Sequence, residues 1–409
     1  SVGEGRVGKQ QRRRRPRDQQ QSGKPVLHRL MVSFAAHRDC LAEAACRVEP
    51  IRIGRSGLAR RAASRFKGRM GDTILVIDEG TSSTRAMLVG IDGRVGAMAQ
   101  RPLTTSYPQP GWVEQDAEQI WQLTLAAARE AIGPDVDRIT AVGITNQRET
   151  IVFWDRATGA ALAPAIVWQD RRTAGVCERL RAEGHEAAVQ ATTGLLLDPY
   201  FSATKIAWAL DHWPALRDAG DRLCVGTIES WLIFRLTGGF YVSDASNASR
   251  TQLMDLRGGW DSGLCDLFGV PSAALPDIVD CAGPIGETSL DHFGRAIPIT
   301  GMAGDQQAAA IGQACTAIGD TKATFGTGAF ILTHAGDTPP ASANRLLSTV
   351  AWQIDGRRCY ALEGSLFVAG QMIHWLRDQL GLLAASSECE ELARSVPDSA
   401  GVRIVPAFA

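Results

Sequence analysis

The pattern of apolar and polar positions predicts short strands interleaved with helices from residue 70 onward. Compact apolar runs at 73–77, 85–91, 139–144, 149–154 and 297–301 predict strands. Apolar residues at helical spacing predict helices over 117–132, 203–218, 224–236 and about 305–313. Strands that alternate with helices are typical of an α/β protein.

The chain also contains an internal repeat. Residues 73–90 read TILVIDEGTSSTRAMLVG, and residues 321–336 read TKATFGTGAFILTHAG. Each segment has the pattern of a strand, a short Gly-Thr turn and a second strand. Two such hairpins, one in each half, predict a duplicated domain with a ligand-binding cleft between the copies.

A polar interruption lies between two of the predicted strands. The segment ITNQRETIVFWD, residues 144–155, places Arg148 and Glu149 side by side between apolar runs. A charged pair in that position either forms an ion pair or faces a polar ligand, and the local pattern leaves both interpretations open.

The turns of the two hairpins carry candidate chemistry for binding anions. The first reads DEGTSST, residues 78–84, and its glycine, hydroxyls and backbone N–H groups suit phosphate oxygens. Asp78 could hold Mg²⁺ through water. The alternative is an ordinary Gly/Ser/Thr turn. A P-loop is excluded, because no GxxxxGK[ST] motif is present. The second turn, Gly326-Thr327-Gly328, would allow a polyphosphate to be clamped from both sides.

Asp305 precedes an Ala-rich helical pattern in GMAGDQQAAAIGQ, residues 301–313. A carboxylate at that position either caps the helix or accepts the proton of an attacking hydroxyl.

Nine segments then resemble, in order and spacing, those of the glycerol kinases of the FGGY carbohydrate kinase family. They are IDEGTSSTR, GWVEQD, GITNQRET, AIVWQDRRT, DPYFSATK, SNASRT, AGDQQAA, FGTGAF and ALEGSLFVAG. The resemblance implies a fold like actin, hexokinase and the Hsp70 ATPase, with two ribonuclease-H-like domains around a nucleotide cleft. It implies a first domain at 70–315 and a partial second domain at 316–409.

The resemblance also implies an activity and a set of site residues. The activity is transfer of phosphate from ATP, with Mg²⁺, to glycerol, giving sn-glycerol 3-phosphate and ADP, with Asp305 as the base. Residues implied to bind glycerol are Arg148, Glu149, Tyr200, Asp305 and Gln306 through hydroxyls, and Trp168 and Phe330 along its carbon side. Residues implied to meet ATP are Thr81, Ser82, Ser83, Arg85, Gly326, Thr327, Gly370 and His374, with Asp78 at the metal.

The chain departs from the family pattern at several places. Glu79 stands where many members have Gln, and His374 stands where a Gln commonly meets the nucleotide. Residues 288–296 lack a Gly-rich loop found in some bacterial members. Members continue well past the final IVPAFA, so we expect an incomplete second domain, and an inactive fragment is one alternative reading.

Charge is distributed unevenly along the chain. Residues 1–69 hold 18 Lys and Arg against 5 Asp and Glu, a net charge of +13, whereas residues 70–409 hold 25 against 39, a net charge of -14. We expect residues 1–69 to be a basic extension outside the domain, such as upstream sequence read through. A disordered tail, a transit peptide and a nucleic-acid-binding arm are the alternatives, and the favoured reading expects no nucleic-acid partner.

Nine cysteines without CxxC or zinc-like spacing indicate reduced thiols and a cytoplasmic protein. No apolar run is long enough to span a bilayer, so no membrane partner is expected. The resemblance implies a homo-oligomer for full-length members. A kinase of a pentulose or sugar acid and an actin-like or chaperone-like ATPase are the competing functions.

Overall fold

The computed structural model describes residues 73–326, 328–402 and 404. Contacts within the chain divide it between residues 371 and 372, and each part is a compact unit of its own. The basic extension predicted at residues 1–69 lies outside the described residues.

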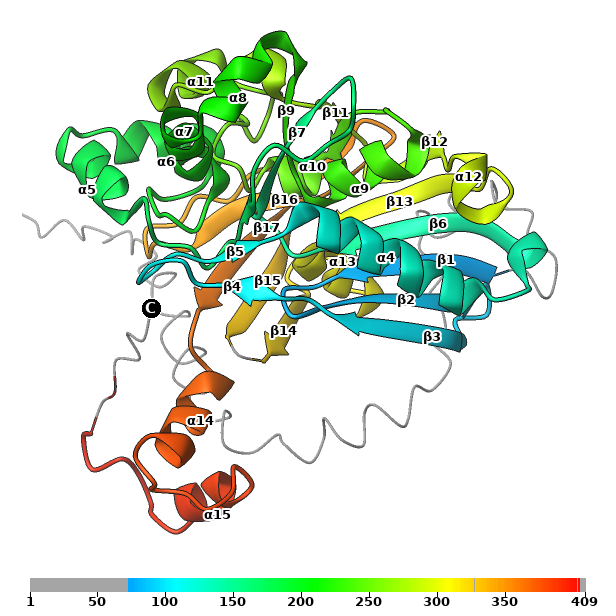
Figure 1. Cartoon of the computed structure of the whole chain (residues 1–409). Coiled ribbons are helices and arrows are strands. Elements are labelled where there is room, and N and C mark those ends of the chain that lie inside the picture. The colour runs from blue at the N-terminus through cyan, green and yellow to red at the C-terminus, as the bar shows by residue number, and fades with distance from the viewer. Residues whose placement is uncertain (1–72, 327, 403, 405–409) are drawn as a thin grey trace, which may run out of the picture. The chain divides into compact units, whose positions relative to one another are not determined.

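The larger unit is built on one ten-stranded mixed sheet (Figure 1). Its strand order is β14-β15-β17-β16-β12-β13-β6-β1-β2-β3. The strands are β1 (Thr73–Glu79), β2 (Ser83–Gly90), β3 (Val95–Pro102), β6 (Ile139–Asn146), β12 (Ala282–Glu287), β13 (Pro298–Gly304), β14 (Thr321–Phe325), β15 (Ala329–Gly336), β16 (Leu347–Ile354) and β17 (Arg357–Leu366).

Three parallel strands at the centre of the sheet position the candidate site. β6 pairs in parallel with β1 on one side and with β13 on the other, so that Asn146 lies opposite Glu79 and Gly304. The carboxyl ends of β1, β6 and β13 therefore meet at one edge of the sheet, where α/β folds commonly bind ligands. The phosphate turn, the Arg148–Glu149 loop and Asp305 each follow one of these three ends.

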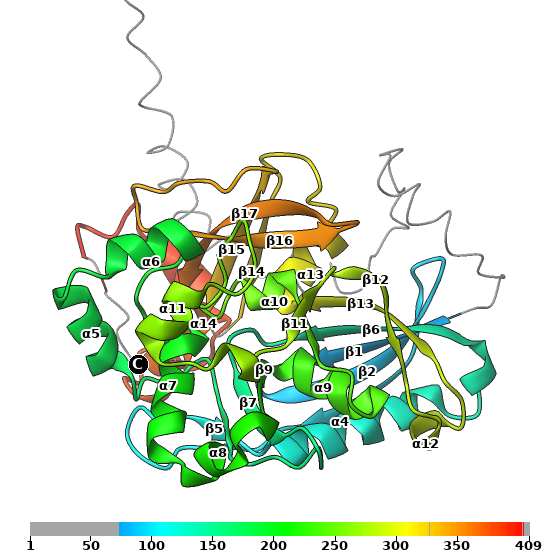
Figure 2. The ribbon, with the colours of Figure 1, turned by 90° about the horizontal axis from the view of Figure 1, so that it is seen from above.

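Two helices cover one face of these strands (Figure 2). α4 (Ala117–Ile132) starts at Asp116, whose side chain accepts hydrogen bonds from two backbone N–H groups of the first turn. Its buried stripe includes Ile120 and Trp121, which join α9 (Ile228–Thr237) and strands β1, β6 and β13 in a single hydrophobic core. The helical periodicity predicted for 117–132 is confirmed to the residue.

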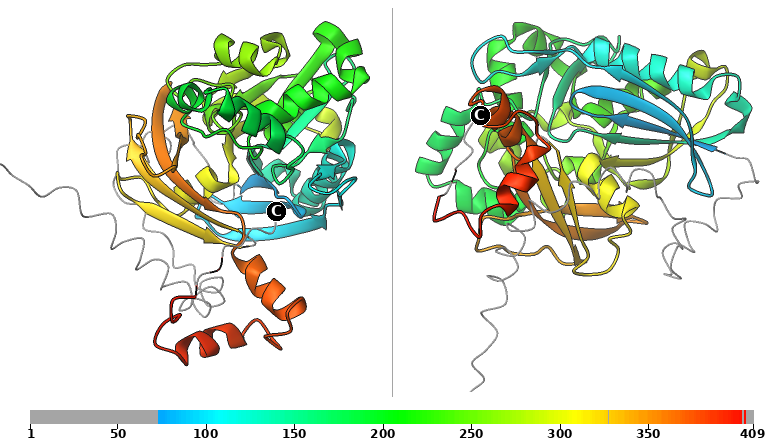
Figure 3. Two further views of the ribbon diagram at one scale, coloured as in Figure 1. Left: turned by 90° about the vertical axis from the view of Figure 1, so that its left-hand side faces the viewer. Right: turned by 90° about the horizontal axis from the view of Figure 1, so that it is seen from below.

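The second predicted hairpin also belongs to the ten-stranded sheet. β14 and β15 pair from Thr321–Thr333 to Phe325–Ala329, which confirms the predicted hairpin. Figure 3 shows the yellow and orange strands β14 to β17 as a layer that continues from the blue strands of the first half. The domain boundary predicted between residues 315 and 316 falls between helix α13 (Asp305–Gly312) and β14 and remains a prediction.

A smaller five-stranded sheet carries a second hydrophobic core. Its order is β4 (Thr105–Ser106), β5 (Glu114–Gln115), β8 (Ala165–Ile166), β7 (Ile151–Asp155) and β9 (Leu223–Thr227). The helices in this part of the chain are α5 (Ala174–Ala182), α6 (Glu186–Thr193), α7 (Ser202–His212), α8 (Pro214–Ala219) and α11 (Ser262–Phe268). Short elements complete the unit: β10 (Val242–Asp244), α10 (Ala245–Ala248), β11 (Asp277–Val279) and α12 (Leu290–Phe293).

Three predicted elements differ from the structure. The helix predicted over 224–236 is wrong in its first part, because residues 223–227 form β9 and only 228–237 are helical. Every residue of β9 is buried, so this strand shows no polar alternation that would distinguish it from a buried helix. The helix predicted over 203–218 is broken at Trp213, since Pro214 starts a new helix. The strand predicted from Glu149 begins at Ile151.

The smaller unit contains the end of α14 (Gly370–Asp378) and α15 (Glu388–Arg394). Arg377 pairs with Asp378 and donates to the Ser386 hydroxyl, which ties α14 to the segment that follows it. In the part of the chain that the structure describes, no helix is long and apolar enough to cross a membrane.

Candidate active site

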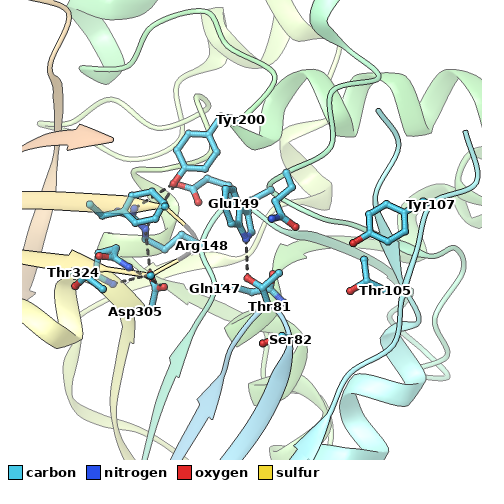
Figure 4. A pocket seen from close by; sticks show the side chains of 16 residues that line it. Thr81, Ser82, Thr105, Tyr107, Gln147, Arg148, Glu149, Tyr200, Asp305 and Thr324 are labelled. Carbon is cyan, nitrogen blue, oxygen red and sulfur yellow. Dashed lines mark hydrogen bonds and ion pairs between the residues drawn. The ribbon is translucent and has the colours of Figure 1, made fainter. Parts of the chain in front are cut away.

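A cavity of about 340 Å³ opens where the three central strands end (Figure 4). Its volume lies at the small end of the roughly 300–1,000 Å³ typical of ligand sites. The cavity receives residues from both predicted hairpins, from the β6–β7 loop and from the start of α13. The lining residues are Thr81, Ser82, Thr105, Tyr107, Gln147, Arg148, Glu149, Trp168, Gln169, Tyr200, Asp305, Gln306, Thr324, Gly326, Gly328 and Phe330.

The β6–β7 loop presents two buried charges to this cavity. Arg148 is 3% exposed and Glu149 is 1% exposed. Glu149 has a φ of 63°, a left-handed conformation that costs a residue with a side chain backbone strain. The loop is held by the Gln147 N–H, which donates to the Glu79 carbonyl at 2.7 Å. A strained, buried and charged turn is the kind of feature that functional sites retain.

Arg148 and Glu149 are paired mainly with other residues rather than with each other. Their closest approach is 3.9 Å, whereas Arg148 makes a two-pronged contact with Glu363 at 2.6 and 3.1 Å. The Arg250 side chain bridges Glu149 at 2.6 Å and Glu363 at 3.0 Å. We call Arg148, Glu149, Arg250 and Glu363 the ion-pair cluster. It contains two charges of each sign, so its members neutralise one another.

Glu363 and Arg148 hold their charges despite burial, whereas burial raises the pKa of Glu149 against the opposing effect of Arg250. Burial alone would raise the pKa of Glu363, but Arg148 and Arg250 together lower it to about 2. Burial disfavours the charged form of Arg148, yet Glu363, Tyr200 and Glu149 raise the pKa of that guanidinium well above its usual value. The guanidinium also donates to the Tyr200 hydroxyl at 3.3 Å. The cluster thus fixes Arg148 and Tyr200 at one wall of the cavity.

Asp305 lies beside that wall at the start of α13. Gly304 occupies the cap position, and the Asp305 carboxylate accepts the backbone N–H of Gln306 at 2.7 Å. Its second oxygen accepts the Gln306 side-chain amide at 3.1 Å, and Arg148 Nε lies 3.4 Å from the first. The side chain remains 39% exposed, so the carboxylate is held in place and still accessible.

Aromatic side chains line the part of the cavity next to the charged wall, and Tyr200 belongs to both. Trp168 and Phe330 meet edge to face with ring centroids 6.2 Å apart, and Tyr200 meets Trp168 at 5.7 Å. Phe367 contacts both Trp168 and Tyr200. Burial raises the pKa of Tyr200 far above its usual value, so its hydroxyl stays neutral. The cavity therefore pairs a charged wall with an apolar one.

The first hairpin turn reaches the cavity through Thr81 and Ser82. The Thr81 hydroxyl accepts the Trp168 indole N–H at 2.9 Å, which links the turn to the aromatic wall. Ser83 and Arg85 point elsewhere: Ser83 accepts the Gln100 amide at 2.8 Å, and Arg85 pairs with Asp78 at 3.0 Å. The structure thus brings two of the four predicted phosphate-binding residues of this turn to the cavity.

The second hairpin turn lies against the residues that follow β17. The Gly370 N–H donates to the Gly326 carbonyl at 2.9 Å, and a Cβ on Gly370 would come within 2.6 Å of that oxygen. Only glycine permits this approach. Thr327 lies outside the described residues. His374 belongs to α14 beyond residue 371, and its predicted nucleotide contact stays a prediction.

Two acidic residues end β1 behind the first turn. Burial raises the pKa of Asp78, Arg85 opposes the shift and the nearby Asp305 adds to it. Asp78 and Asp305 are thus close enough for their charges to interact. Burial raises the pKa of Glu79 to about 8, against an opposing hydrogen bond from Thr124, so Glu79 is mostly a neutral acid at pH 7. A neutral acid resembles the glutamine expected at this position. Among the described residues, no group of three or more His, Cys, Asp or Glu side chains is arranged to hold a metal ion.

Several residues of the site are absent from the expectations drawn from sequence. Arg250 and Glu363 complete the ion-pair cluster, and Phe367 completes the aromatic wall. Arg250 lies in SNASRT and Glu363 in ALEGSLFVAG, two of the recognised segments. Their positions in those segments are the sequence feature that could have identified them, since neither residue stands out by local pattern.

Comparison with known proteins places this arrangement in a family. A model of the FGGY family of carbohydrate kinases, N-terminal domain, matches residues 73–312. The glycerol kinase of Xanthobacter autotrophicus is 53% identical over 346 residues, which cover 83% of this chain and 70% of that protein.

Solved structures agree with the sequence relatives. Plasmodium falciparum glycerol kinase with ADP superposes with a TM-score of 0.77 at 35% identity, covering 82% of this chain and 69% of that one. Xylulose kinase from Rhodospirillum rubrum superposes with a TM-score of 0.70 at 29% identity, covering 80% and 68%. The expected actin- and hexokinase-like α/β fold is thereby confirmed.

Proposed function

This chain belongs to the FGGY family of carbohydrate kinases, and we propose that it transfers the γ-phosphoryl group of ATP to glycerol, giving sn-glycerol 3-phosphate and ADP. The observation that carries the proposal is the cavity that Asp305 lines together with buried charged side chains and aromatic rings. Glycerol has that same division, with three hydroxyls along one edge and a three-carbon chain along the other.

The cavity walls account for binding of a small triol. The charged wall offers fixed hydrogen-bonding groups on Arg148, Glu149 and Tyr200, and their positions are set by bonds within the protein. Trp168 and Phe330 would pack on the carbon chain. A ligand that left these buried polar groups unpaired would lose about 1–3 kcal/mol for each one, which disfavours less hydroxylated molecules.

Asp305 supplies the base of the proposed reaction. Its carboxylate takes the proton of a terminal glycerol hydroxyl while that oxygen forms a bond to the γ-phosphorus and the bond from phosphorus to the β-phosphate oxygen breaks. Arg148 and Gln306 orient the carboxylate toward the cavity. Thr81, Ser82 and the backbone around Gly326 are available to phosphate oxygens from two sides.

Mg²⁺ would neutralise charge on the phosphates of ATP, as in other phosphoryl transfers. Mg²⁺ is commonly held by one or two carboxylates together with substrate phosphates. Asp78, at the end of β1, is the carboxylate that we assign to this role, and its pairing with Arg85 at 3.0 Å would have to yield to the ion.

We also place the protein in the cytoplasm, where ATP is plentiful and thiols stay reduced. The seven cysteines within the described residues are all free.

The proposal is tested by following ADP formation with Mg·ATP in the presence of glycerol, xylulose or gluconate. Glycerol-dependent turnover that exceeds turnover with either sugar is expected. A preference for xylulose or gluconate would replace the substrate while leaving the family intact. ADP formation that is independent of any polyol would instead support a chaperone-like ATPase.

A further inference from the structure

A buried lysine lies directly behind the catalytic aspartate. Lys322 is the second residue of β14 and is 1% exposed. Its ammonium group donates to the side-chain oxygen of Gln306 and, at 2.9 Å, to the hydroxyl of Thr324. Gln306 and Thr324 both line the cavity.

The partners of this ammonium group are neutral. Among the described residues, Lys322 forms no ion pair within 4.0 Å. Burial and the nearby Arg148 lower the pKa of Lys322 to about 8, against the opposing effects of Asp305, Glu363 and Cys315. A buried cation without a paired carboxylate costs stability. A lysine kept at that cost suggests a role beyond packing.

The chemistry of the ammonium group determines how its neighbours are oriented. A protonated lysine is a donor only, so the Gln306 side-chain oxygen must face it. The NH₂ group of the same amide is then turned toward Asp305, whose outer carboxylate oxygen it meets at 3.1 Å. A side chain without a donor at position 322 would not select which end of the Gln306 amide faces it.

The same argument applies to Thr324. Its hydroxyl oxygen accepts from Lys322, so its own proton is free to point away from the lysine. Thr324 lines the cavity, and its hydroxyl is thus prepared to donate to an oxygen of a bound ligand.

We propose that Lys322 is a positioning residue of this site, which acts through Gln306 to orient the Asp305 carboxylate and through Thr324 to present a hydroxyl donor to the substrate. The inference rests on the proposed function, because it assigns the oriented groups to glycerol and its phosphoryl transfer.

The experiment measures glycerol binding by calorimetry to the full chain carrying Lys322→Met, Gln306→Ala or both. Methionine is unbranched like lysine and one heavy atom shorter, so it fills most of the site, but it cannot donate. We expect Lys322→Met to weaken binding about tenfold. Because the lysine acts partly through Gln306, Lys322→Met should weaken binding less in the Gln306→Ala background than in the wild type. Losses that multiply would overturn the proposal.

Thr321→Val is the matched control on the same strand. Thr321 is exposed and bonds only to the Gly319 carbonyl and to Thr333 on the neighbouring strand. Its loss should leave glycerol binding unchanged. Equal weakening in Thr321→Val and Lys322→Met would mean that the strand, and not the ammonium group, is responsible.

A pH series separates positioning from a merely structural role. Wild-type affinity should fall as pH rises through about 8, where Lys322 loses its proton, and approach the affinity of Lys322→Met near pH 9.5. Glu79 and Lys205 titrate in the same range but are present in both proteins, so the ratio of the two affinities isolates Lys322. A ratio that stays constant to pH 9.5 would overturn the proposal.

The NMR signals of the Gln306 side-chain amide give a readout that needs no ligand. They are identified by their loss in Gln306→Ala, and they should shift between wild type and Lys322→Met. If the folded wild type fails to bind glycerol, the proposed function fails, and these signals still decide whether Lys322 orients the amide. Identical amide signals in the two proteins would contradict the inference.

Discussion

The charged wall of the cavity and the two hairpin turns beside it are stabilised in opposite ways. The charged wall is made of four buried acidic and basic side chains whose contacts join residues more than 100 positions apart in the chain. The hairpin turns place Thr81, Ser82, Gly326 and Gly328 at the cavity, and each lies between two strands that are adjacent in sequence. The first arrangement depends on the whole fold, and the second depends on local geometry.

Substitutions in the two regions should therefore affect stability and catalysis differently. A change in the ion-pair cluster leaves charges buried without partners, so it should reduce stability and binding together. A change at the turns or at Asp305 leaves the buried charges paired, so it should alter catalysis with little effect on folding.

Glu363→Gln removes the carboxylate that neutralises Arg148 and Arg250. Breaking one partner of a buried pair typically costs about 3–5 kcal/mol, and we expect a loss of free energy of unfolding in that range. Urea unfolding followed by circular dichroism measures it.

Glu183→Gln is the control for that variant, because Glu183 forms an exposed pair with Arg179 on α5. It should change stability by less than about 0.5 kcal/mol. Similar losses of free energy of unfolding in the two variants would show that burial of the cluster does not determine the effect.

Asp305→Asn tests the opposite case. The side chain is partly exposed, so stability should change little, while turnover should fall by a factor on the order of 10²–10⁴ with loss of the base. Steady-state ADP formation and calorimetric glycerol binding are measured on the same preparation. Turnover close to that of wild type would remove Asp305 from its assigned role.

Glu79→Gln tests a carboxyl group that is buried without a partner of opposite sign. Because burial raises the pKa of Glu79 to about 8, its contribution to stability is fully present below pH 4.5 and is lost as pH rises through 8. Glutamine does not titrate, so the variant should become more stable than wild type as pH rises, by on the order of 2 kcal/mol near pH 9. Melting temperatures from pH 5 to 9 check this, and a difference that does not depend on pH would contradict it.

Gly370→Ala tests the second phosphate turn. A methyl group there would come within 2.6 Å of the Gly326 carbonyl, so the turn must move, at a cost of about 1–3 kcal/mol. We expect a higher KM for ATP with glycerol affinity retained.

Gly175→Ala, where the added carbon has open space, is the control and should be neutral or slightly stabilising. Loss of glycerol affinity in Gly370→Ala would contradict the division between the charged wall and the hairpin turns.

The sequence was sufficient where a pattern is local. The helix at 117–132 and the hairpins starting at residues 73 and 321 follow from periodicity and turn residues, and the structure confirms them. The stretch at 223–227 was misread because a strand buried on both faces shows no alternation. Local pattern drew attention to Arg148, Glu149 and Asp305, while their roles came from resemblance to a family.

Long-range partners could not be predicted in this way. Glu363 lies 215 positions from Arg148, and Lys322 lies 16 positions beyond Gln306 on a different element. Nothing in a single sequence indicates that a glutamate in one segment neutralises an arginine in another. Only the folded chain brings them together.

The most direct measurement is a calorimetric titration of the wild-type chain with glycerol, alongside xylulose at the same concentrations. The account predicts saturable binding of one glycerol per chain and weaker or undetectable binding of xylulose. A folded chain that binds no glycerol, or that binds xylulose more tightly, would contradict the claim that the two-walled cavity is built for glycerol.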